Sequence, residues 1–433
     1  MTGLQVGDVV TVTVGDVAHG GHCVARHEGQ VLFVRHTLPG EVVAVRVTEV
    51  GSGARFVRAD AVEVLTASPE RVEPPCPYAG PGRCGGCDWQ HATLEEQRRL
   101  KARVVVEQFT RLARLDVEEH VGPVVCEAVP GDQQGLRWRT RVELALRGGR
   151  PGLRAHRSHE VVPVDDCLIA HPGVVRSGVF DTDPSRGQLP RTVVAVDVVA
   201  PSVGAPVLVP LAPPAPRRGG HAPASGGRRR RATRDSPVPL GPVPTVTERV
   251  GDHEFVLSAR SFWQVHPGAA TTFTDQVLTW LDPQPGERAL DLYAGVGLFA
   301  VPLAERVGPT GAVLAVEADR EAAASAAGHL EPWPWASSLA APTEWALTDL
   351  LASDERADVV VLDPPRTGAG RAVVEALAQL GPRAVVYVAC DPAALARDVA
   401  IARECGLELA ALRVLDAFPM THHVECLALL LPA

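Results

Sequence analysis

Lysine is nearly missing from this chain of 433 residues, in which Lys101 is the only one. Arginine therefore carries the basic charge, and it clusters at 137–141, 154–157 and 228–234. The formal net charge of −9 at pH 7 argues against a protein that is basic overall, as most duplex-binding proteins are. A locally basic face on an acidic protein is compatible with the arginine clusters.

Long apolar runs are also missing, since none reaches the roughly 18 residues that a membrane helix needs. Residues 1–10 show no charged segment followed by an apolar core, which a secretory leader would have. We therefore expect a cytoplasmic protein with no membrane partner. In that compartment the nine cysteines are metal ligands, catalysts or core residues rather than disulfides. The length and the 46% hydrophobic content suffice for two or three domains.

The first 65 residues alternate short β-rich runs with glycine and proline. This spacing predicts about five strands in a small barrel of the OB type, although any small β domain would fit the alternation. The segment VLFVRHTLPGE (31–41) resembles the TRAM domain, an OB-like RNA-binding module. We assign residues 1–67 to such a domain.

Three cysteines follow, at positions 76, 84 and 87, in the pattern CP…CGGC. Their spacing lets them reach one tetrahedral or cubane centre, and the two intervening glycines free the backbone to wrap it. Cys167 is the best candidate for a fourth ligand. Zinc and an iron–sulfur cluster both fit this pattern. We assign residues 68–200 to a central region with the cysteine cluster and a β-rich domain.

Residues 201–244 are rich in proline, glycine and arginine and cannot build a core. We interpret them as a linker or insertion, in which Arg228–Arg231 either contacts phosphates or is merely solvated. From residue 245 to 433, strand-like and alanine-rich helical segments alternate. This alternation predicts an α/β domain with a doubly wound, mostly parallel sheet. In such sheets ligands bind beyond the carboxyl ends of the strands.

A nucleoside cofactor is predicted from the start of this α/β domain. The turn DLYAGVGLF (291–299) has a Gly-x-Gly pair but lacks the third glycine of a dinucleotide motif. Glu317 ends the next strand, where its carboxylate can accept both ribose hydroxyls. S-adenosylmethionine therefore fits better than NAD. Asp363 follows another strand, and the Pro-Pro pair after it turns the chain at the cofactor crevice.

Two further residues have side chains suited to catalysis. Cys390 lies between the strand AVVYVA and a helix that begins at Asp391-Pro392, where the helix dipole can lower a thiol pKa. A buried structural cysteine is the alternative. Glu425 enters the apolar strand VECLALLL, which suggests a raised pKa and proton transfer. The alternative is an exposed glutamate at a strand start.

Together these segments resemble the uridine-5 RNA methyltransferases that carry a TRAM domain and an iron–sulfur cluster. The resemblance covers PGE, CP…CGGC, SFWQV, DLYAGVGLF, VEAD, LDPPRTG, YVACDPAALARD and FPMTHHVE. It implies a class I, Rossmann-like methyltransferase domain, with Cys390 as nucleophile and Glu425 as base. It assigns the cofactor contacts to Gln264, Tyr293, Glu317 and Asp363. It assigns the ligands of a [4Fe-4S] cluster to Cys76, Cys84, Cys87 and Cys167. The implied partner is ribosomal or transfer RNA, bound by a monomer.

The chain departs from this family pattern at three places. Members commonly have Asn where this chain has Asp391, and many have Asn where Leu298 stands. The arginine-rich insertion has no expected counterpart. Two other functions compete with the resemblance. A non-catalytic RNA-binding iron–sulfur protein would not need Cys390 and Glu425, and an N6-adenine or cytosine methyltransferase would leave both unexplained.

Overall fold

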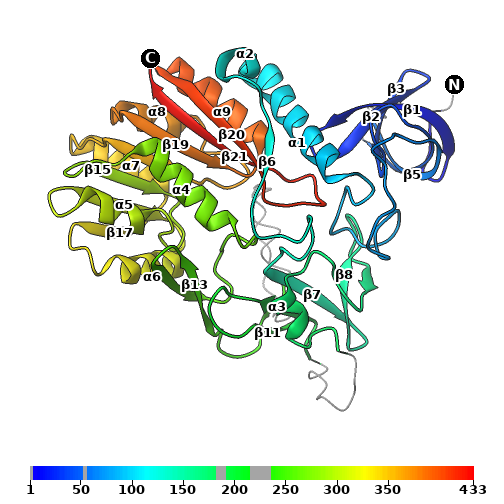
Figure 1. Cartoon of the computed structure of the whole chain (residues 1–433), viewed down its shortest axis with the longest axis horizontal. Helices are drawn as coiled ribbons and strands as arrows, with labels where there is room; N and C mark the ends of the chain where they lie inside the picture. Colours follow the sequence, from blue (N-terminus) through cyan, green and yellow to red (C-terminus); the bar gives the residue numbers. More distant parts are fainter. Residues whose placement is uncertain (1–2, 52–55, 182–191, 215–235) are drawn as a thin grey trace, which may run out of the picture.

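The computed structural model describes residues 3–51, 56–181, 192–214 and 236–433. A small barrel and a large α/β unit lie on either side of helix α1, and a smaller sheet lies below them in the view of Figure 1. The predicted run Arg228–Arg231 lies outside the described residues. No helix among the described residues is both long and apolar enough to cross a membrane. The division at residues 67, 200 and 244 stays a prediction.

The amino-terminal strands close into a barrel in the order β1-β2-β3-β5-β4, which confirms the predicted OB-like barrel. Alternate side chains point inward and form one apolar core, as the period of two requires. The barrel strands are β1 (Val9–Ala18), β2 (His22–His27), β3 (Gln30–Arg35), β4 (Val42–Val50) and β5 (Val57–Thr66).

Helix α1 (Leu94–Gln108) joins the barrel to the α/β unit. Thr93 caps it by accepting a hydrogen bond from the Glu96 N–H. Leu100 packs into the barrel core, whereas Val105 packs into the core of the large sheet. The helix therefore fixes the barrel next to the α/β unit. It continues into η2 (Phe109–Ala113) and is followed by α2 (Val117–Val121).

The smaller sheet has the strand order β12-β11-β10-β7-β8-β9 and is antiparallel throughout. Its elements are β7 (Arg141–Arg147), β8 (Arg150–Arg154), β9 (Val161–Pro163), α3 (Pro172–Arg176), β10 (Ala195–Val199), β11 (Val207–Ala212) and β12 (Val238–Pro239). A separate hairpin leads to the α/β unit and comprises β13 (Thr245–Val250) and β14 (His253–Ser258).

The large sheet has the order β17-β16-β15-β18-β19-β21-β20-β6, parallel from β17 to β19 and antiparallel at β21. Its strands are β6 (Cys126–Ala128), β15 (Arg288–Leu292), β16 (Ala312–Glu317), β17 (Ala336–Ala340), β18 (Val359–Leu362), β19 (Ala384–Ala389), β20 (Leu407–Asp416) and β21 (Glu425–Pro432). Its helices are α4 (Ala269–Leu281), α5 (Ala300–Val307), α6 (Arg320–Leu330), α7 (Thr343–Ala352), α8 (Arg371–Gln379) and α9 (Pro392–Glu404). This arrangement confirms the predicted α/β fold.

Strand β19 shows why the central strands are continuously apolar. Its odd and even residues alternate between the two cores on either side of the sheet, and every residue in it is buried. Helices α4 and α5 contribute to one core, and α7, α8, α9 and α1 contribute to the other. The polar residues that follow the central strands therefore gather at one edge of the sheet.

Candidate active site

Cys390 lies between the end of β19 and the start of α9, as the sequence predicts. Pro392 occupies the first turn of the helix, and Asp391 is the N-cap. The Asp391 Oδ1 accepts a hydrogen bond from the Ala394 N–H at 2.8 Å. The short turn holds the Cys390 thiol at the carboxyl ends of the parallel strands, where the residue is partly exposed.

Glu425 is brought to the same edge by the strand that neighbours β19. Strand β21 runs antiparallel to β19, with Cys426 opposite Ala389, so that Glu425 comes beside Cys390. The Glu425 side chain is buried, and the residue is 4% exposed. Burial, and then the charge of Asp363, raise the pKa of Glu425 well above its usual value. This direction agrees with the sequence-based expectation.

Asp363 follows β18 directly and completes this acidic group. Burial raises the pKa of Asp363 to about 7. Burial, the charge of Glu425 and the charge of Asp363 together raise the pKa of Cys390 to about 12. The expectation that the helix terminus lowers this thiol pKa is therefore wrong for the free protein. Arg366 is a nearby cation that acts in the opposite direction on both Cys390 and Glu425.

Asp398 of α9 anchors the loop that carries Asp363 and Arg366. Asp398 Oδ2 accepts hydrogen bonds from the Tyr387 hydroxyl and from the Ala369 N–H, both at 2.7 Å. Gly368 has φ +86°, and a Cβ there would lie 2.6 Å from Asp398 Oδ2. Only glycine fits this close approach without strain. The buried Asp398 thus fixes the loop against α9.

The predicted ribose-binding carboxylate lies next to the glycine turn. Glu317 Oε2 accepts a hydrogen bond from the Gly295 N–H at 2.9 Å, and Oε1 accepts one from the Asp319 N–H at 2.7 Å. Tyr293 has φ +61°, a conformation that is uncommon for a residue with a side chain. It redirects the chain from β15 into the turn. Burial and the charge of Glu344 raise the pKa of Tyr293 to about 12.

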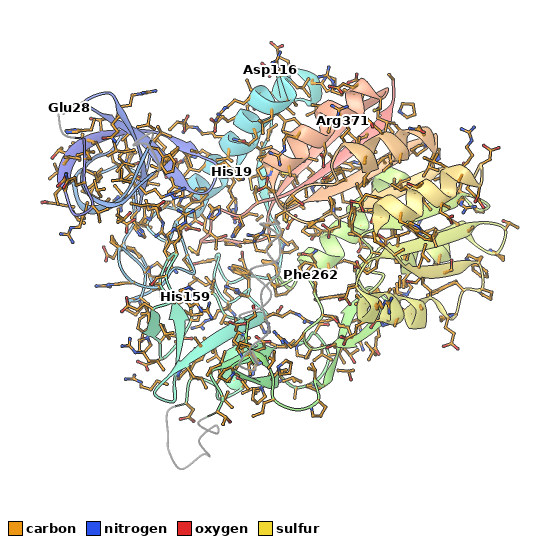
Figure 2. The ribbon with its side chains drawn as sticks, turned by 180° about the vertical axis from the view of Figure 1, so that it is seen from behind. His19, Glu28, Asp116, His159, Phe262 and Arg371 are labelled. Atoms are coloured by element: carbon orange, nitrogen blue, oxygen red, sulfur yellow. The ribbon has the colours of Figure 1, made fainter. Side chains whose placement is uncertain are left out.

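Gln264 comes from a segment that precedes β15 in the chain. Its side chain is buried in the segment between β14 and α4. Its role as a cofactor contact stays a prediction. Two residues before it, Phe262 is 72% exposed, which is unusual for so large an aromatic side chain. Figure 2 shows Phe262 between the smaller sheet and the α/β unit.

Asp291 is a site residue that sequence reasoning did not assign. It is fully buried in β15, and its Oδ2 accepts a hydrogen bond from the Ala300 N–H at 2.8 Å. Its Oδ1 has no partner among the described residues, and burial raises its pKa well above the usual value. Through the bond to Ala300, Asp291 holds the start of α5 against the sheet from inside the protein. The signal was an acid inside an apolar strand.

The four predicted ligand cysteines line one cavity together. The Gly86 N–H points to the Cys84 Sγ at 3.4 Å, and burial raises the pKa of the Cys84 thiol to about 11. Among the described residues, no three His, Cys, Asp or Glu side chains are already gathered tightly enough to hold one metal ion. Four cysteine side chains nevertheless surround a common space, with a backbone N–H directed at one sulfur, and cysteine sulfurs are the ligands of iron–sulfur clusters.

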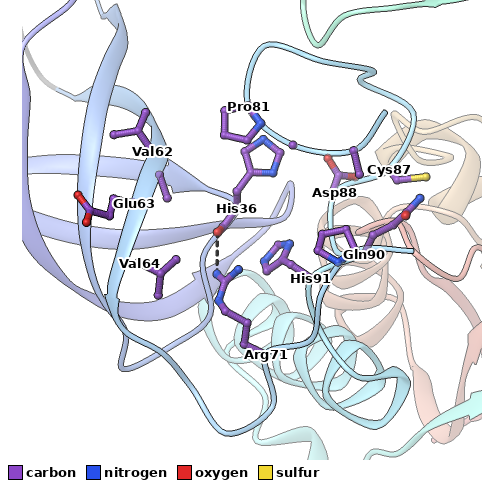
Figure 3. A pocket seen from close by; sticks show the side chains of 14 residues that line it. His36, Val62, Glu63, Val64, Arg71, Pro81, Cys87, Asp88, Gln90 and His91 are labelled. Carbon is purple, nitrogen blue, oxygen red and sulfur yellow. Dashed lines mark hydrogen bonds between the residues drawn. The ribbon is translucent and has the colours of Figure 1, made fainter. Parts of the chain in front are cut away.

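The segment that carries these cysteines also packs against the barrel. Figure 3 shows His36 of the barrel near Asp88, in a pocket that Cys87 and Gln90 also line. Arg71 donates a hydrogen bond to the His36 carbonyl at 2.8 Å (Figure 3). It also donates one to the buried Glu41 carboxylate at 2.6 Å. These bonds hold the chain that leads to the cysteine segment against the barrel.

A basic cavity opens between the barrel, the cysteine segment and the β8–β9 connection. Its basic lining residues are His22, Arg35, Arg58, Arg83, His156 and Arg157, against the acidic Glu49 and Asp60. The Arg58 guanidinium lies 5.4 Å from the Phe56 ring centroid, which holds it in place. Burial and the charge of Arg58 lower the pKa of His22 to about 4. The two histidines are therefore neutral at pH 7, and four arginines against two carboxylates make the cavity a positive region on an acidic protein.

Two family models match the chain. A TRAM domain model matches residues 3–62, and a tRNA (Uracil-5-)-methyltransferase model matches residues 345–432. An uncharacterized RNA methyltransferase of Streptomyces avermitilis is 46% identical and covers 99% of both chains. The 23S rRNA (uracil(1939)-C(5))-methyltransferase RlmD of Pseudomonas aeruginosa is 33% identical, over 98% of this chain and 95% of its own. Among solved structures, the Pyrococcus abyssi tRNA (uracil-54, C5)-methyltransferase in complex with S-adenosyl-L-homocysteine has the same fold, with a TM-score of 0.68 at 20% identity, over 98% of this chain and 100% of its own.

Proposed function

Because the chain belongs to the S-adenosylmethionine-dependent RNA uracil-C5 methyltransferases, we propose that it methylates a uridine of ribosomal or transfer RNA through a covalent bond between Cys390 and C6 of the base. The observation that carries this proposal is the meeting of Cys390 and Glu425 at the ends of two paired strands. One can act as a nucleophile and the other as a base on the same ring.

The chemistry follows from the weak nucleophilicity of uracil C5. Addition of the Cys390 thiolate to C6 gives C5 enolate character and makes it reactive towards an electrophile. S-adenosylmethionine supplies the methyl group that C5 takes up. The Glu425 carboxylate then removes the C5 proton, and elimination breaks the bond to C6 and returns the thiolate. Each turnover therefore leaves one proton on Glu425, which is released to solvent.

The charges around Cys390 support this sequence of steps. In the free protein the charges of Glu425 and Asp363 raise the pKa of Cys390, and the charge of Asp363 raises the pKa of Glu425. A sulfonium cation bound among them favours their anionic forms, because an opposite charge stabilises a carboxylate or thiolate. The nucleophile and the base would thus be ionised mainly when the methyl donor is bound. Arg366 contributes in the same direction.

We further propose that Cys76, Cys84, Cys87 and Cys167 hold the [4Fe-4S] cluster. Their shared cavity and the N–H directed at Cys84 support this ligand set. The methyl transfer requires no electron, so the cluster would hold the cysteine segment in shape rather than react.

RNA binding is proposed at the basic cavity and at Phe262. Arginine side chains bind phosphates, and exposed aromatic rings stack on unpaired bases. Phosphate binding by the run Arg228–Arg231, which lies outside the described residues, stays a prediction. The target uridine must leave any stack to reach a partly buried thiol. A monomer in the cytoplasm stays a prediction.

The direct test compares Cys390→Ala with Cys405→Ala on RNA from cells that lack the gene. Cys405 is a matched control, since it is also partly exposed and caps the other end of α9. We expect labelled methyl transfer to be lost in Cys390→Ala and kept in Cys405→Ala, with 5-methyluridine mapped by mass spectrometry. Full activity of Cys390→Ala would disprove covalent catalysis. Methylation of adenine or cytosine instead would disprove the assigned substrate.

A further inference from the structure

The turn between β1 and β2 of the barrel contacts the catalytic edge of the α/β unit. His19 Nε2 lies 3.2 Å from Asp391 Oδ2, and Figure 2 shows His19 between the barrel and that unit. Gly21 Cα approaches the same region so closely that a Cβ there would lie 2.6 Å from the His422 Cβ. The Trp89 Nε1–H donates to the Gly21 carbonyl at 3.1 Å. The turn thus contacts Asp391, His422 and Trp89, all of which are remote from it in sequence.

The two carboxylate oxygens of Asp391 make different contacts. Oδ1 caps α9 through the Ala394 N–H, while Oδ2 faces His19. An asparagine, common at this place in the family, could cap the helix as well but would add no charge. The aspartate places a carboxylate next to a thiol that must ionise, and this charge raises the pKa of Cys390.

The groups that face Cys390 make this extra charge significant. Glu425 from β21 and Asp363 from the loop after β18 oppose ionisation, whereas Arg366 from the same loop favours it. The groups that face Asp391 are His19 from the barrel and Arg397 from α9. His19 is the group in hydrogen-bonding contact with the carboxylate oxygen that the helix cap leaves free.

We propose that His19 is a positioning residue for catalysis, whose Nε2 holds the free oxygen of Asp391 in place next to Cys390. The barrel would then act on the catalytic turn directly, besides binding RNA. The proposal rests on the proposed role of Cys390, but it concerns the reactivity of that thiol and can be tested without methyl transfer. Because His19 is 42% exposed on its side chain, the effect is modest.

The test measures alkylation of Cys390 by iodoacetamide in the full-length protein, purified anaerobically. The modified peptide is quantified by mass spectrometry, which separates Cys390 from the other cysteines. Below the thiol pKa the rate is proportional to the thiolate fraction, so it reports ionisation at about pH 8.5. We expect His19→Ala to slow the reaction roughly 1.5- to 5-fold, since the contact that is lost is partly exposed and its contribution is about 0.2–1 kcal/mol. The logarithm of the rate should rise with pH in parallel for both proteins.

A second variant distinguishes the contact of His19 with the Asp391 carboxylate from simple packing. Asp391→Asn removes the carboxylate and keeps the cap, so His19→Ala should have no further effect in that background. The matched control is His253→Ala, since His253 Nε2 lies 3.2 Å from Glu305 Oε2 on the β13–β14 hairpin and this pair should leave Cys390 unchanged. An unaltered alkylation rate in His19→Ala, or a slow double variant, would overturn the proposal. If instead Cys390→Ala keeps methylating RNA, the proposed function fails whatever the alkylation rates are.

Discussion

The Asp88 carboxylate accepts a hydrogen bond from His422 Nδ1 at 2.6 Å, although 334 residues separate the two. Asp88 directly follows Cys87 of the cysteine segment, and His422 lies in the turn that precedes Glu425. The Asp88 and Trp89 N–H groups both donate to the Met420 carbonyl, at 2.9 and 3.0 Å. Burial opposes ionisation of Asp88, but the hydrogen bonds and charge of His422 together with the charge of Arg35 outweigh it and lower the Asp88 pKa. The cysteine segment therefore supports the turn that presents the proposed base.

This contact leads to a prediction for the cluster. Cys167→Ser should lower the iron content of anaerobically purified protein from about four per chain and slow RNA methylation. S-adenosylhomocysteine affinity should stay the same, because the cofactor residues lie on other strands. Iron analysis and calorimetry measure the two effects, with the buried barrel residue Cys23 as control in Cys23→Ser. Stoichiometric zinc without iron in the unaltered protein would support a metal site at these cysteines but disprove the iron–sulfur cluster.

Asp363 gives a prediction about pH. The pKa of Asp363 is raised to about 7, so in the protein without ligand this carboxyl group is neutral below that pH and charged above it. A sulfonium favours the charged form, so S-adenosylmethionine should bind more tightly as the pH rises towards about 7 and then level off. Neutral S-adenosylhomocysteine should show a smaller change. Calorimetric affinities for both ligands would measure this. An equally steep pH dependence in Asp363→Asn would assign the effect to another group.

The basic cavity gives a prediction about salt. Changing both Arg58 and Arg157 to Gln should weaken RNA binding and flatten the plot of log affinity against log salt by up to about 1.4 units, or about 0.7 for each lost phosphate contact on a single strand. Arg46→Gln is the control, since Arg46 is exposed on the barrel outside the cavity lining. Filter binding across salt concentrations measures the slope. An unchanged slope would exclude phosphate contacts at this cavity.

Phe262 gives a prediction about base stacking. Loss of its ring in Phe262→Ala should weaken RNA binding by about 1–3 kcal/mol, the usual contribution of one stacked base. The stability of the protein should hardly change, because the ring is 72% exposed. Trp345→Ala is the matched control, since Trp345 is 56% exposed on α7. Equal effects of the two substitutions on RNA affinity would argue against a specific stacking role.

Sequence reasoning predicted the elements around the site because their signals are local. The run AVVYVA followed by Asp391-Pro392 defines a strand, a turn and a capped helix within nine residues, and the structure has all three. It could not predict the contacts of His19 with Asp391 or of Asp88 with His422, which depend on how the barrel and the cysteine segment pack on the sheet. The predicted direction of the Cys390 pKa was wrong for the same reason. The acidic neighbours that raise this pKa follow or begin two other strands of the sheet.

The remaining prediction separates the roles of Cys390 and Glu425. Removal of the C5 proton comes after the methyl group has been transferred, so Glu425→Gln should still allow addition and methylation. Elimination would then be blocked, because Gln cannot take the proton, and the RNA would stay attached to Cys390. We expect a protein–RNA adduct that survives denaturing electrophoresis in Glu425→Gln and is absent in the double variant with Cys390→Ala. RNA that contains 5-fluorouridine should trap the unaltered enzyme in the same way, because fluorine cannot leave as a proton. Glu408→Gln is a control on the neighbouring strand, where the carboxylate pairs with Arg403 at 3.0 Å.

Normal turnover in Glu425→Gln with no adduct would assign the proton transfer to another group. Asp363 would be the next residue to test, since its charge acts on both Cys390 and Glu425.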